Sequence, residues 1–185
     1  MLSMAITPKI GITGVPMVGK TEGLLRVIQR LENEYTFGGM ITDSIEEKGE
    51  RVGFTVLDWR TKKTGIFAHV DLDTVYRVGK YRIDLKVLEK IGIPAIENAI
   101  EDEAVDIVII DEVGKMELES KKFRAVVRRA LEADKPLLLT LHKKSRDSLL
   151  QDIRNMDDVR ILEITAVNRN ILPYKIDRIL KEGMQ

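Results

Sequence analysis

The chain has 185 residues, in which 30 lysines and arginines balance 30 aspartates and glutamates, and cysteine is absent. This length suits one sizeable α/β core, so we expect a single domain over residues 1–185. The balanced charge argues against nucleic-acid binding through the overall field, and the lack of cysteine excludes disulfides and thiolate metal sites. No apolar run approaches the eighteen residues of a membrane span, and the first residues lack the apolar stretch of a signal peptide. We therefore expect a soluble, cytoplasmic monomer.

The N-terminal part has the pattern of a strand, a glycine loop and a helix. Residues 9–13 read KIGIT, a short apolar strand, and apolar residues at helical spacing predict an amphipathic helix over residues 20–33. Between them, GVPMVGKT at residues 14–21 has two glycines five positions apart, followed by a lysine and a hydroxyl residue, as phosphate-binding loops do. The first turn of a helix offers free N–H groups and a positive dipole end to an anion. This order of elements therefore favours a phosphate-binding loop.

Each residue type in this loop suits a triphosphate. Backbone N–H groups of residues 15–21 are expected to surround the β-phosphate, with one donor fewer at Pro16. Lys20 is expected to reach the β- and γ-phosphates, and the Thr21 hydroxyl to bind a Mg²⁺ ion that bridges them. The alternative interpretation is a glycine turn beside a solvated lysine.

Residues 37–85 follow a different pattern, in which apolar and polar residues alternate between turn signals such as EKGE and KKTG. Antiparallel ribbons have this pattern, so we predict a β-meander inserted after the first helix. YRVGKYR at residues 76–82 contains a second Gly-Lys pair, but Thr74 stands where a phosphate-binding loop needs its first glycine. We do not expect a second phosphate site there.

The remaining chain alternates between helices and strands. A helix is expected over residues 86–99, broken by Gly92 and Pro94. The later elements expected are a buried strand at 105–111, a helix at 118–133, a buried strand at 137–141, a helix at 145–153, a strand at 159–164 and a helix from about Asn168. Continuous apolar strands alternating with helices are typical of a parallel sheet covered on both faces. We therefore predict a three-layer α/β/α fold with a mainly parallel sheet, carrying the β-meander as an insertion at residues 37–85.

An acidic pair, Asp111 and Glu112, ends the buried strand VDIVII. An aspartate at the carboxyl end of a parallel strand lies near the ligand crevice of the sheet, where it can hold a water on Mg²⁺. The adjacent glutamate can accept a proton from the water that attacks the γ-phosphate, a role that a hydrolase needs and a kinase does not. The competing interpretation is a pair of solvated acids that cap the next helix. Their combination with Lys20 and Thr21 favours catalysis.

Weaker candidates lie further along the chain. Thr140 and His142 close a strand at a place where a polar side chain can sense the γ-phosphate, although we interpret His142 as structural. Lys115, Lys143 and Arg146 can supply positive charge to a transition state, although most surface cations are only solvated.

Contacts to the base or ribose are expected from Asn168 and Arg169, in the segment TAVNRNILP that opens the last helix. For Asn168 the alternative is a plain helix cap. Because the phosphates receive most of the identifiable contacts, we expect several triphosphates to be accepted.

These segments together resemble the small nucleoside-triphosphatases first described from thermophiles, whose human relative is called cancer-related nucleoside-triphosphatase. The resemblance is carried by ITGVPMVGKT (12–21), GGMITDSIEEKGERVGF (38–54), YRVGKYRIDL (76–85), IIDEVGKMEL (109–118) and NRNILP (168–173), which span nearly the whole chain. It implies a RecA-like phosphate-loop fold and slow Mg²⁺-dependent hydrolysis of ATP, GTP and other triphosphates to diphosphate and phosphate. One departure is Glu22, where many phosphate-loop proteins carry a second threonine or serine, which loosens the expected contacts to the α-phosphate.

The resemblance assigns Glu112 as the base and Thr21 and Asp111 as Mg²⁺ ligands, and Lys20 completes the predicted catalytic pair. The full set of residues expected to contact the nucleotide is Gly14, Val15, Pro16, Met17, Val18, Gly19, Lys20, Thr21, Asp111, Glu112, Val113, Gly114, Asn168 and Arg169.

Three other functions compete with the triphosphatase. A small-molecule or nucleotide kinase shares the loop and helix, but no arginine-rich lid is visible. A regulatory GTPase would explain the D-x-x-G spacing of residues 111–114, but the Asn-Lys-x-Asp guanine reader is missing from the sequence. A non-enzymatic RNA-binding module finds little support in a balanced charge and 5% aromatic residues.

Overall fold

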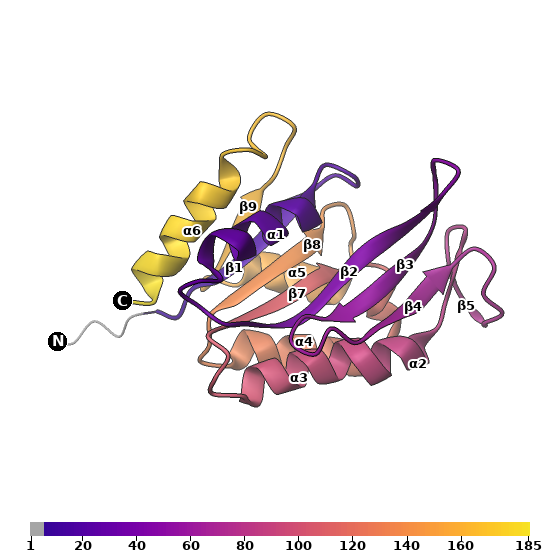
Figure 1. Ribbon diagram of the computed structural model, residues 1–185, viewed down its shortest axis with the longest axis horizontal. Coiled ribbons are helices and arrows are strands. Elements are labelled where there is room, and N and C mark those ends of the chain that lie inside the picture. The colour runs from indigo at the N-terminus through magenta and orange to yellow at the C-terminus, as the bar shows by residue number, and fades with distance from the viewer. Residues whose placement is uncertain (1–5) are drawn as a thin grey trace.

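One mixed sheet runs through residues 6–185, the part of the chain that this computed structural model describes (Figure 1). Its strands lie side by side in the order β5-β6-β4-β3-β2-β7-β8-β1-β9. The strands are β1 (Lys9–Gly14), β2 (Phe37–Glu47), β3 (Glu50–Asp58), β4 (Thr64–His69), β5 (Tyr76–Val78), β6 (Tyr81–Ile83), β7 (Ile107–Val113), β8 (Leu137–His142) and β9 (Val159–Glu163). The helical segments are α1 (Lys20–Leu31), α2 (Leu85–Val87), the π-helical η1 (Leu88–Gly92), α3 (Ile93–Glu101), the 3₁₀ turn η2 (Glu117–Glu119), α4 (Lys121–Glu132), α5 (Ser148–Asn155) and α6 (Leu172–Gly183).

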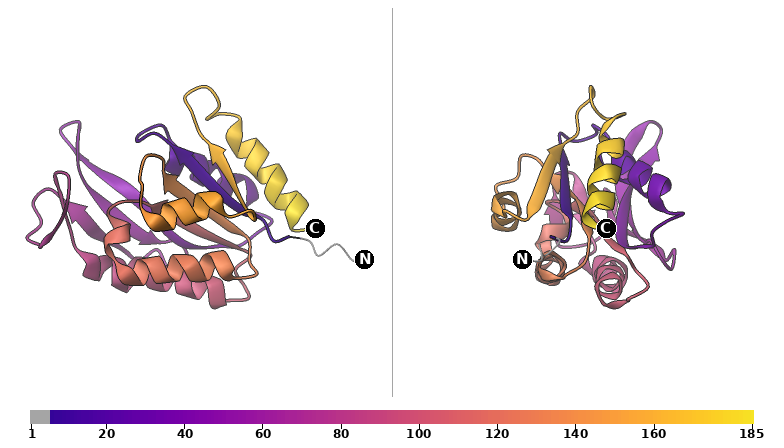
Figure 2. Two further views of the ribbon diagram at one scale, coloured as in Figure 1. Left: turned by 180° about the vertical axis from the view of Figure 1, so that it is seen from behind. Right: turned by 90° about the vertical axis from the view of Figure 1, so that its left-hand side faces the viewer.

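Helices cover both faces of the sheet because successive strand residues point to opposite sides. In β7, Ile107 and Ile109 enter the core beneath α1 and α6, whereas Val108 and Ile110 enter the core beneath α3, α4 and α5. Figure 2 shows these two groups of helices on either side of the sheet. The predicted three-layer α/β/α arrangement is confirmed. Within residues 6–185 every helix falls short of the length and apolarity that crossing a bilayer requires.

The prediction of a mainly parallel sheet is wrong. Parallel pairing joins β2, β7, β8, β1 and β9, whereas β2, β3, β4, β6 and β5 pair antiparallel. The strand β2 belongs to both halves, since its first residues, 37–40, pair with β7 and the strand then continues beside β3. The antiparallel strands expected within residues 37–85 are present, but they extend the same sheet rather than forming a separate insertion.

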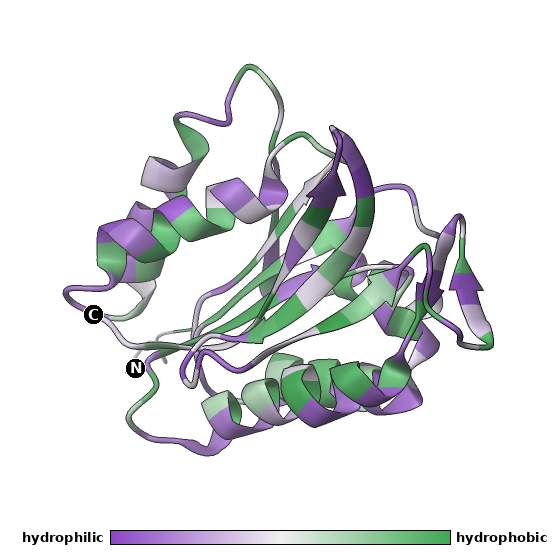
Figure 3. Ribbon diagram, turned by 45° about the vertical axis from the view of Figure 1, so that its right-hand side comes forward, coloured by the Kyte–Doolittle hydropathy of each residue, from purple (hydrophilic) through white to green (hydrophobic). Residues whose placement is uncertain are grey.

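The turn between β2 and β3 forms at EKGE, one of the turn signals that predicted the antiparallel strands. Lys48 and Gly49 both have positive φ, 51° and 80°, and they connect Glu47 to its partner Glu50. Two such residues form the type of tight turn that matches the twist of an antiparallel pair. We call β2 and β3 together the β2–β3 ribbon. Figure 3 shows that its tip is hydrophilic, in contrast to the green, hydrophobic faces that the helices turn toward the sheet.

The predicted break at Gly92 and Pro94 is absent. Helical backbone continues from α2 through η1 into α3, and the missing N–H of Pro94 falls next to the π-helical segment η1, where the hydrogen-bond pattern is already irregular. Gly92 is explained by packing instead, because a Cβ atom there would lie 2.8 Å from the sulfur of Met40 and 3.1 Å from a methyl group of Val56. Close approach to β2 and β3, not helix termination, requires this glycine.

Several boundaries also differ from the prediction. The strand β7 includes Asp111 and Glu112, and the turn η2 precedes α4. The last helix begins at Leu172 instead of Asn168. The Asn168 side chain accepts a hydrogen bond from the backbone N–H of Thr165 at 2.7 Å and donates one to the carbonyl of Glu163 at 2.8 Å, so it closes a turn before the helix. Local hydrogen bonds of this kind compete with helix formation.

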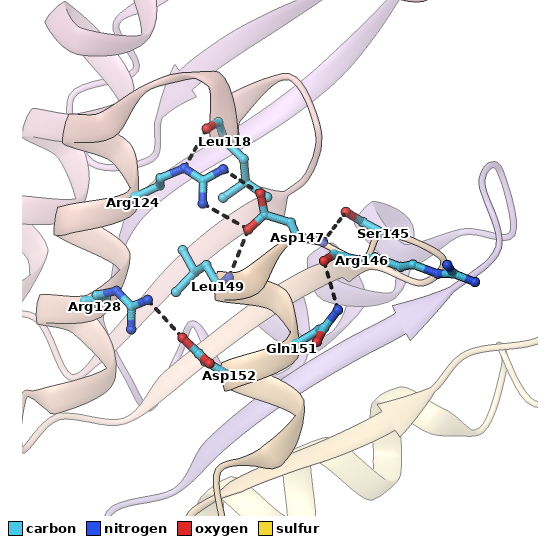
Figure 4. A network of polar contacts seen from close by, with 9 residues as sticks. All are labelled: Leu118, Arg124, Arg128, Ser145, Arg146, Asp147, Leu149, Gln151 and Asp152. Atoms are coloured by element: carbon cyan, nitrogen blue, oxygen red, sulfur yellow. Dashed lines mark hydrogen bonds and ion pairs between the residues drawn. The ribbon is translucent and has the colours of Figure 1, made fainter.

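A polar network joins α4 to the start of α5 (Figure 4). Arg124 donates two hydrogen bonds to the carboxylate of Asp147, at 3.0 and 2.5 Å, and Asp147 accepts from the backbone N–H of Leu149 at 2.9 Å. Asp147 is therefore both the cap of α5 and its tie to the neighbouring helix. The hydrogen bond from Arg124 lowers the pKa of Asp147 below its ordinary value.

Changing Asp147 to Asn should lower the free energy of unfolding by about 1–2 kcal/mol at pH 7, because asparagine can cap the helix but cannot form the ion pair. Since the folded-state pKa is lowered, this contribution is present above the unfolded pKa and is lost as the pH falls through the folded pKa. Urea unfolding at several pH values measures the difference. The control is Asp152→Asn, whose pair with Arg128 is about half exposed on both sides and should contribute no more than about 0.5 kcal/mol.

Candidate active site

A cleft of about 520 Å³ lies where β1, β7 and β8 reach their carboxyl ends. One wall is the glycine loop, residues 14–19, with the first turn of α1. The opposite wall is the β2–β3 ribbon with the turn between β5 and β6. The lining residues are Pro16, Met17, Gly19, Lys20, Thr21, Glu22, Thr42, Asp43, Ser44, Arg51, Phe54, Val78, Gly79, Tyr81, Glu112, Lys115, Met116, Glu117 and His142.

The glycine loop turns sharply between β1 and α1. Met17 and Gly19 have positive φ, 64° and 110°. Gly14 is required by close packing, since a Cβ atom there would lie 2.8 Å from the backbone oxygen of Ile164 and 2.8 Å from the Val18 side chain. The loop therefore brings the start of α1, with its free backbone N–H groups, to the mouth of the cleft.

Lys20 is buried, with 8% of its surface exposed, and its ammonium group folds back over the glycine loop. Its Nζ donates to the carbonyl oxygen of Gly14 at 3.1 Å and forms an ion pair with Oε2 of Glu112 at 3.1 Å. A residue of the first helix and a residue of β7, far apart in the chain, are thus in direct contact. The structure brings together the two residues that the sequence predicts as catalytic.

Asp111 lies at the centre of the site with none of its surface exposed. Thr140 donates to its carboxylate at 2.6 Å, and the Thr21 hydroxyl lies 2.9 and 3.1 Å from its two oxygens. The pKa of Asp111 is raised to about 6, chiefly by burial and also by the charge of Glu112, while the hydrogen bonds from Thr140 and Thr21 lower it. Among residues 6–185 the side-chain hydrogen bonds to this carboxylate come from neutral hydroxyl groups, and no cation pairs with it.

The donor set at Asp111 and Thr21 fits a Mg²⁺ ion shared with phosphates. Magnesium prefers oxygen ligands and is commonly held through one or two protein groups together with substrate phosphates. Within residues 6–185, histidine, cysteine and acidic side chains form no cluster of three or more that could hold a metal on their own. A cation beside the Thr21 hydroxyl would also offset the buried charge of Asp111.

An irregularity in β7 aims the acidic residues into the site. From Ile110 to Val113 the strand advances three residues while its partner β8 advances two, from Leu139 to Leu141. Such bulges re-aim side chains next to active sites. Asp111 and Glu112 occupy this bulge, and only Glu112 lines the cleft.

A second carboxyl group, that of Glu117, lies close to Glu112. A Cβ atom on Gly114 would lie 2.8 Å from Oε1 of Glu112 and 2.9 Å from Oε2 of Glu117, so glycine leaves room for both. Glu117 is 3% exposed, and burial, followed by the charge of Glu112, raises its pKa well above the ordinary value. The site therefore pairs the part-exposed carboxyl group of Glu112 with a buried neighbour whose pKa is raised.

Several predicted residues lie outside the cleft. Val113 is buried in the core, and Gly114 is beside the carboxyl groups without lining the cleft. Asn168 and Arg169 also do not line it. In the glycine loop, Pro16, Met17 and Gly19 face the cleft, whereas Gly14, Val15 and Val18 do not line it.

Of His142 and the three candidate cations, two residues line the cleft and two do not. Lys115 and His142 line the cleft, and burial lowers the pKa of His142. Lys143 is paired with Glu163, and Figure 4 shows the side chain of Arg146 extending away from the other labelled residues. Neither of these two lines the cleft.

Sequence reasoning missed the wall formed by the β2–β3 ribbon. Arg51, Phe54 and Tyr81 line the cleft, as do Thr42 and Glu117. The alternation of apolar and polar residues predicted the antiparallel strands that carry all of these residues except Glu117. No local pattern indicates that these strands lie across from the glycine loop.

Changing Asp111 to Asn should stabilise the metal-free protein at pH 8, by about 2 kcal/mol, because it removes an uncompensated buried charge. The folded state binds the proton more tightly than the unfolded state, so the stability of the unaltered protein falls as the pH rises from about 4 to 6. The advantage of the variant should therefore shrink as the pH is lowered below 6. Thermal unfolding in the presence of a chelator measures both effects, and a variant that is less stable than the unaltered protein at pH 8 contradicts this account.

Comparison with known proteins identifies the family of this chain. The profile of the NTPase family matches residues 9–177. The nucleoside-triphosphatase THEP1 of Thermoplasma acidophilum is 37% identical over 182 residues, covering 98% of each chain, and that of Thermotoga sp. strain RQ2 is 43% identical over 173 residues, covering 94% of this chain and 95% of the relative.

Solved structures agree with the sequence relatives. The crystal structure of THEP1 from Aquifex aeolicus matches with a TM-score of 0.83 and 30% identity, covering 94% of this chain and 99% of that one. The solution structure of a human cancer-related nucleoside triphosphatase matches with a TM-score of 0.81 and 29% identity, covering 95% and 98%. With a family profile that spans nearly the whole sequence and relatives aligned end to end, the chain belongs to the NTPase family.

Proposed function

We propose that this protein is a Mg²⁺-dependent nucleoside-triphosphatase of the RecA-like phosphate-loop class, which hydrolyses ATP, GTP and other triphosphates to diphosphate and phosphate. The observation that carries the proposal is the convergence of two distant segments. Lys20 and Thr21 from the start of α1 contact Glu112 and Asp111 of β7 at 3.1 and 2.9 Å. The names of the THEP1 relatives support the reaction.

The protein groups divide into those that bind phosphates and those that act on water. The backbone N–H groups at the start of α1 suit the β-phosphate, and Lys20 is placed to bind the β- and γ-phosphates. Thr21 and Asp111 are the residues that would hold Mg²⁺, and the bound ion would bridge the phosphates and offset their charge.

Glu112 is the group proposed to accept the proton of the attacking water. Its carboxylate lines the cleft next to Lys20, the residue proposed to bind the terminal phosphate, and this contact supports the role. Burial and the charge of Glu112 raise the pKa of Glu117, which favours the neutral form of this neighbouring carboxyl group. Because Asn168 and Arg169 do not line the cleft, the phosphates dominate recognition, which is consistent with broad use of triphosphates.

Replacing Lys20 by alanine should abolish turnover of triphosphates, because the variant loses the only buried cation in contact with the glycine loop among residues 6–185. The measurement is phosphate release from ATP, GTP, CTP and UTP, with and without Mg²⁺. Unaltered turnover would reject the role assigned to Lys20. If the terminal phosphate moves to an added acceptor instead of being released, the protein is a kinase and not a triphosphatase.

Replacing Glu112 by glutamine should slow hydrolysis by about 10²-fold or more while Mg²⁺·ATP still binds, because glutamine cannot accept the proton. Single-turnover phosphate release measures hydrolysis, and equilibrium binding of a non-hydrolysable ATP analogue measures affinity. Glu119→Gln is the matched control, since Glu119 is exposed, lies seven positions along the chain and does not line the cleft. A Glu112→Gln variant with normal turnover would place the base elsewhere.

A further inference from the structure

Arg51, near the start of β3, lines the same cleft as Lys20 and Glu112 but reaches it from the opposite wall. Its Nε atom is buried and has no hydrogen-bond partner. Within residues 6–185 the guanidinium group makes no ion pair, even with Glu46, which lies opposite it in the β2–β3 ribbon. An unpaired donor at a buried position is costly, so the Nε–H group of Arg51 is left unsatisfied in the free protein.

Neighbouring aromatic residues fix the position of Arg51. Its guanidinium carbon lies 5.4 Å from the centre of the Phe54 ring. Tyr81 packs edge-on against that ring, with the centroids 5.2 Å apart, and its hydroxyl donates to the backbone carbonyl of Arg51 at 3.3 Å. All three side chains line the cleft. The backbone is thus tied to β6, and the charged group is held over an apolar surface instead of in an ion pair.

The other cations near the site are less suited to a new phosphate contact. Lys20, which contacts the glycine loop and Glu112, is already assigned to the β- and γ-phosphates, and Lys143 is paired with Glu163. Lys115 lines the cleft but is exposed to solvent. A guanidinium offers several donors in a fixed fork that matches phosphate oxygens, so an unpaired arginine can give all of them to a ligand.

We propose that Arg51 is a catalytic residue that contacts the terminal phosphoryl group and stabilises the negative charge that moves onto the departing diphosphate. This inference rests on the proposed triphosphatase function. In the reaction, the water oxygen bonds to the γ-phosphorus as the bond to the β–γ bridging oxygen breaks. The diphosphate leaves with that electron pair, Glu112 takes the water proton, and Arg51 stays protonated throughout.

The test compares Arg51→Met with Arg51→Lys. Methionine keeps an apolar stem over Phe54 but removes the charge, so kcat/KM should fall by about 10²-fold or more, chiefly through kcat. Lysine should restore only part of the activity because it lacks the fork. Affinity for Mg²⁺·ADP should not change, since the diphosphate lacks the group that Arg51 contacts.

Added guanidinium ion should partly restore the activity of Arg51→Ala but not that of Lys20→Ala.

Two control variants and a binding measurement make the test decisive. Arg82→Met removes the same charge from an exposed position on β6 and should retain full activity. Normal kcat/KM in a folded Arg51→Met protein overturns the proposal, as does a loss seen with Lys115→Met and not with Arg51→Met. If the unaltered protein releases no phosphate, the triphosphatase proposal fails. The Arg51 contact is then tested by binding alone, because Arg51→Met should lower the affinity for a non-hydrolysable triphosphate and leave ADP binding unchanged.

Discussion

The contact between the Thr21 hydroxyl and the buried carboxylate of Asp111 is the interaction on which the site depends. Thr21 comes from the first helix, Asp111 from β7, and Thr140, the second donor to the same carboxylate, from β8. A charge that is fully buried must be hydrogen-bonded, so these three residues can occupy only a narrow range of positions. Because Lys20 is the neighbour of Thr21 in the chain and Glu112 the neighbour of Asp111, this contact also restricts the backbone positions of Lys20 and Glu112.

The two halves of the sheet contribute differently to the cleft. The parallel half ends in the glycine loop and the acidic pair, because the carboxyl ends of β1, β7 and β8 lie at one edge. The antiparallel half supplies the facing wall, with Phe54 and Tyr81 as an apolar surface. The strand β2 belongs to both halves and connects them rigidly. A cleft between two parts of one sheet needs no hinge between domains.

Most of the wall formed by the glycine loop and the acidic pair could be predicted from the sequence. The strand, glycine loop and helix are local in the chain, and the apolar strand before Asp111 marks where that aspartate emerges. The Arg51 wall could not be predicted, because its place across from Lys20 depends on pairing between distant strands. The prediction of a helix break at Gly92 and Pro94 was wrong. Local helix-breaking rules do not account for the close approach of Gly92 to Met40 and Val56. At Asn168, side-chain hydrogen bonds to Thr165 and Glu163 closed a turn that helical periodicity does not reveal.

The ion pair between Lys20 and Glu112 makes the two ends of the proposed chemistry mutually dependent. In this structure the ammonium group of Lys20 lies 3.1 Å from Oε2 of Glu112, so each group occupies the position next to the other in the cleft. A triphosphate that attracts the ammonium group sets the carboxylate free at the same moment. Under the proposed function, binding of the substrate and release of the base would be coupled through this one contact.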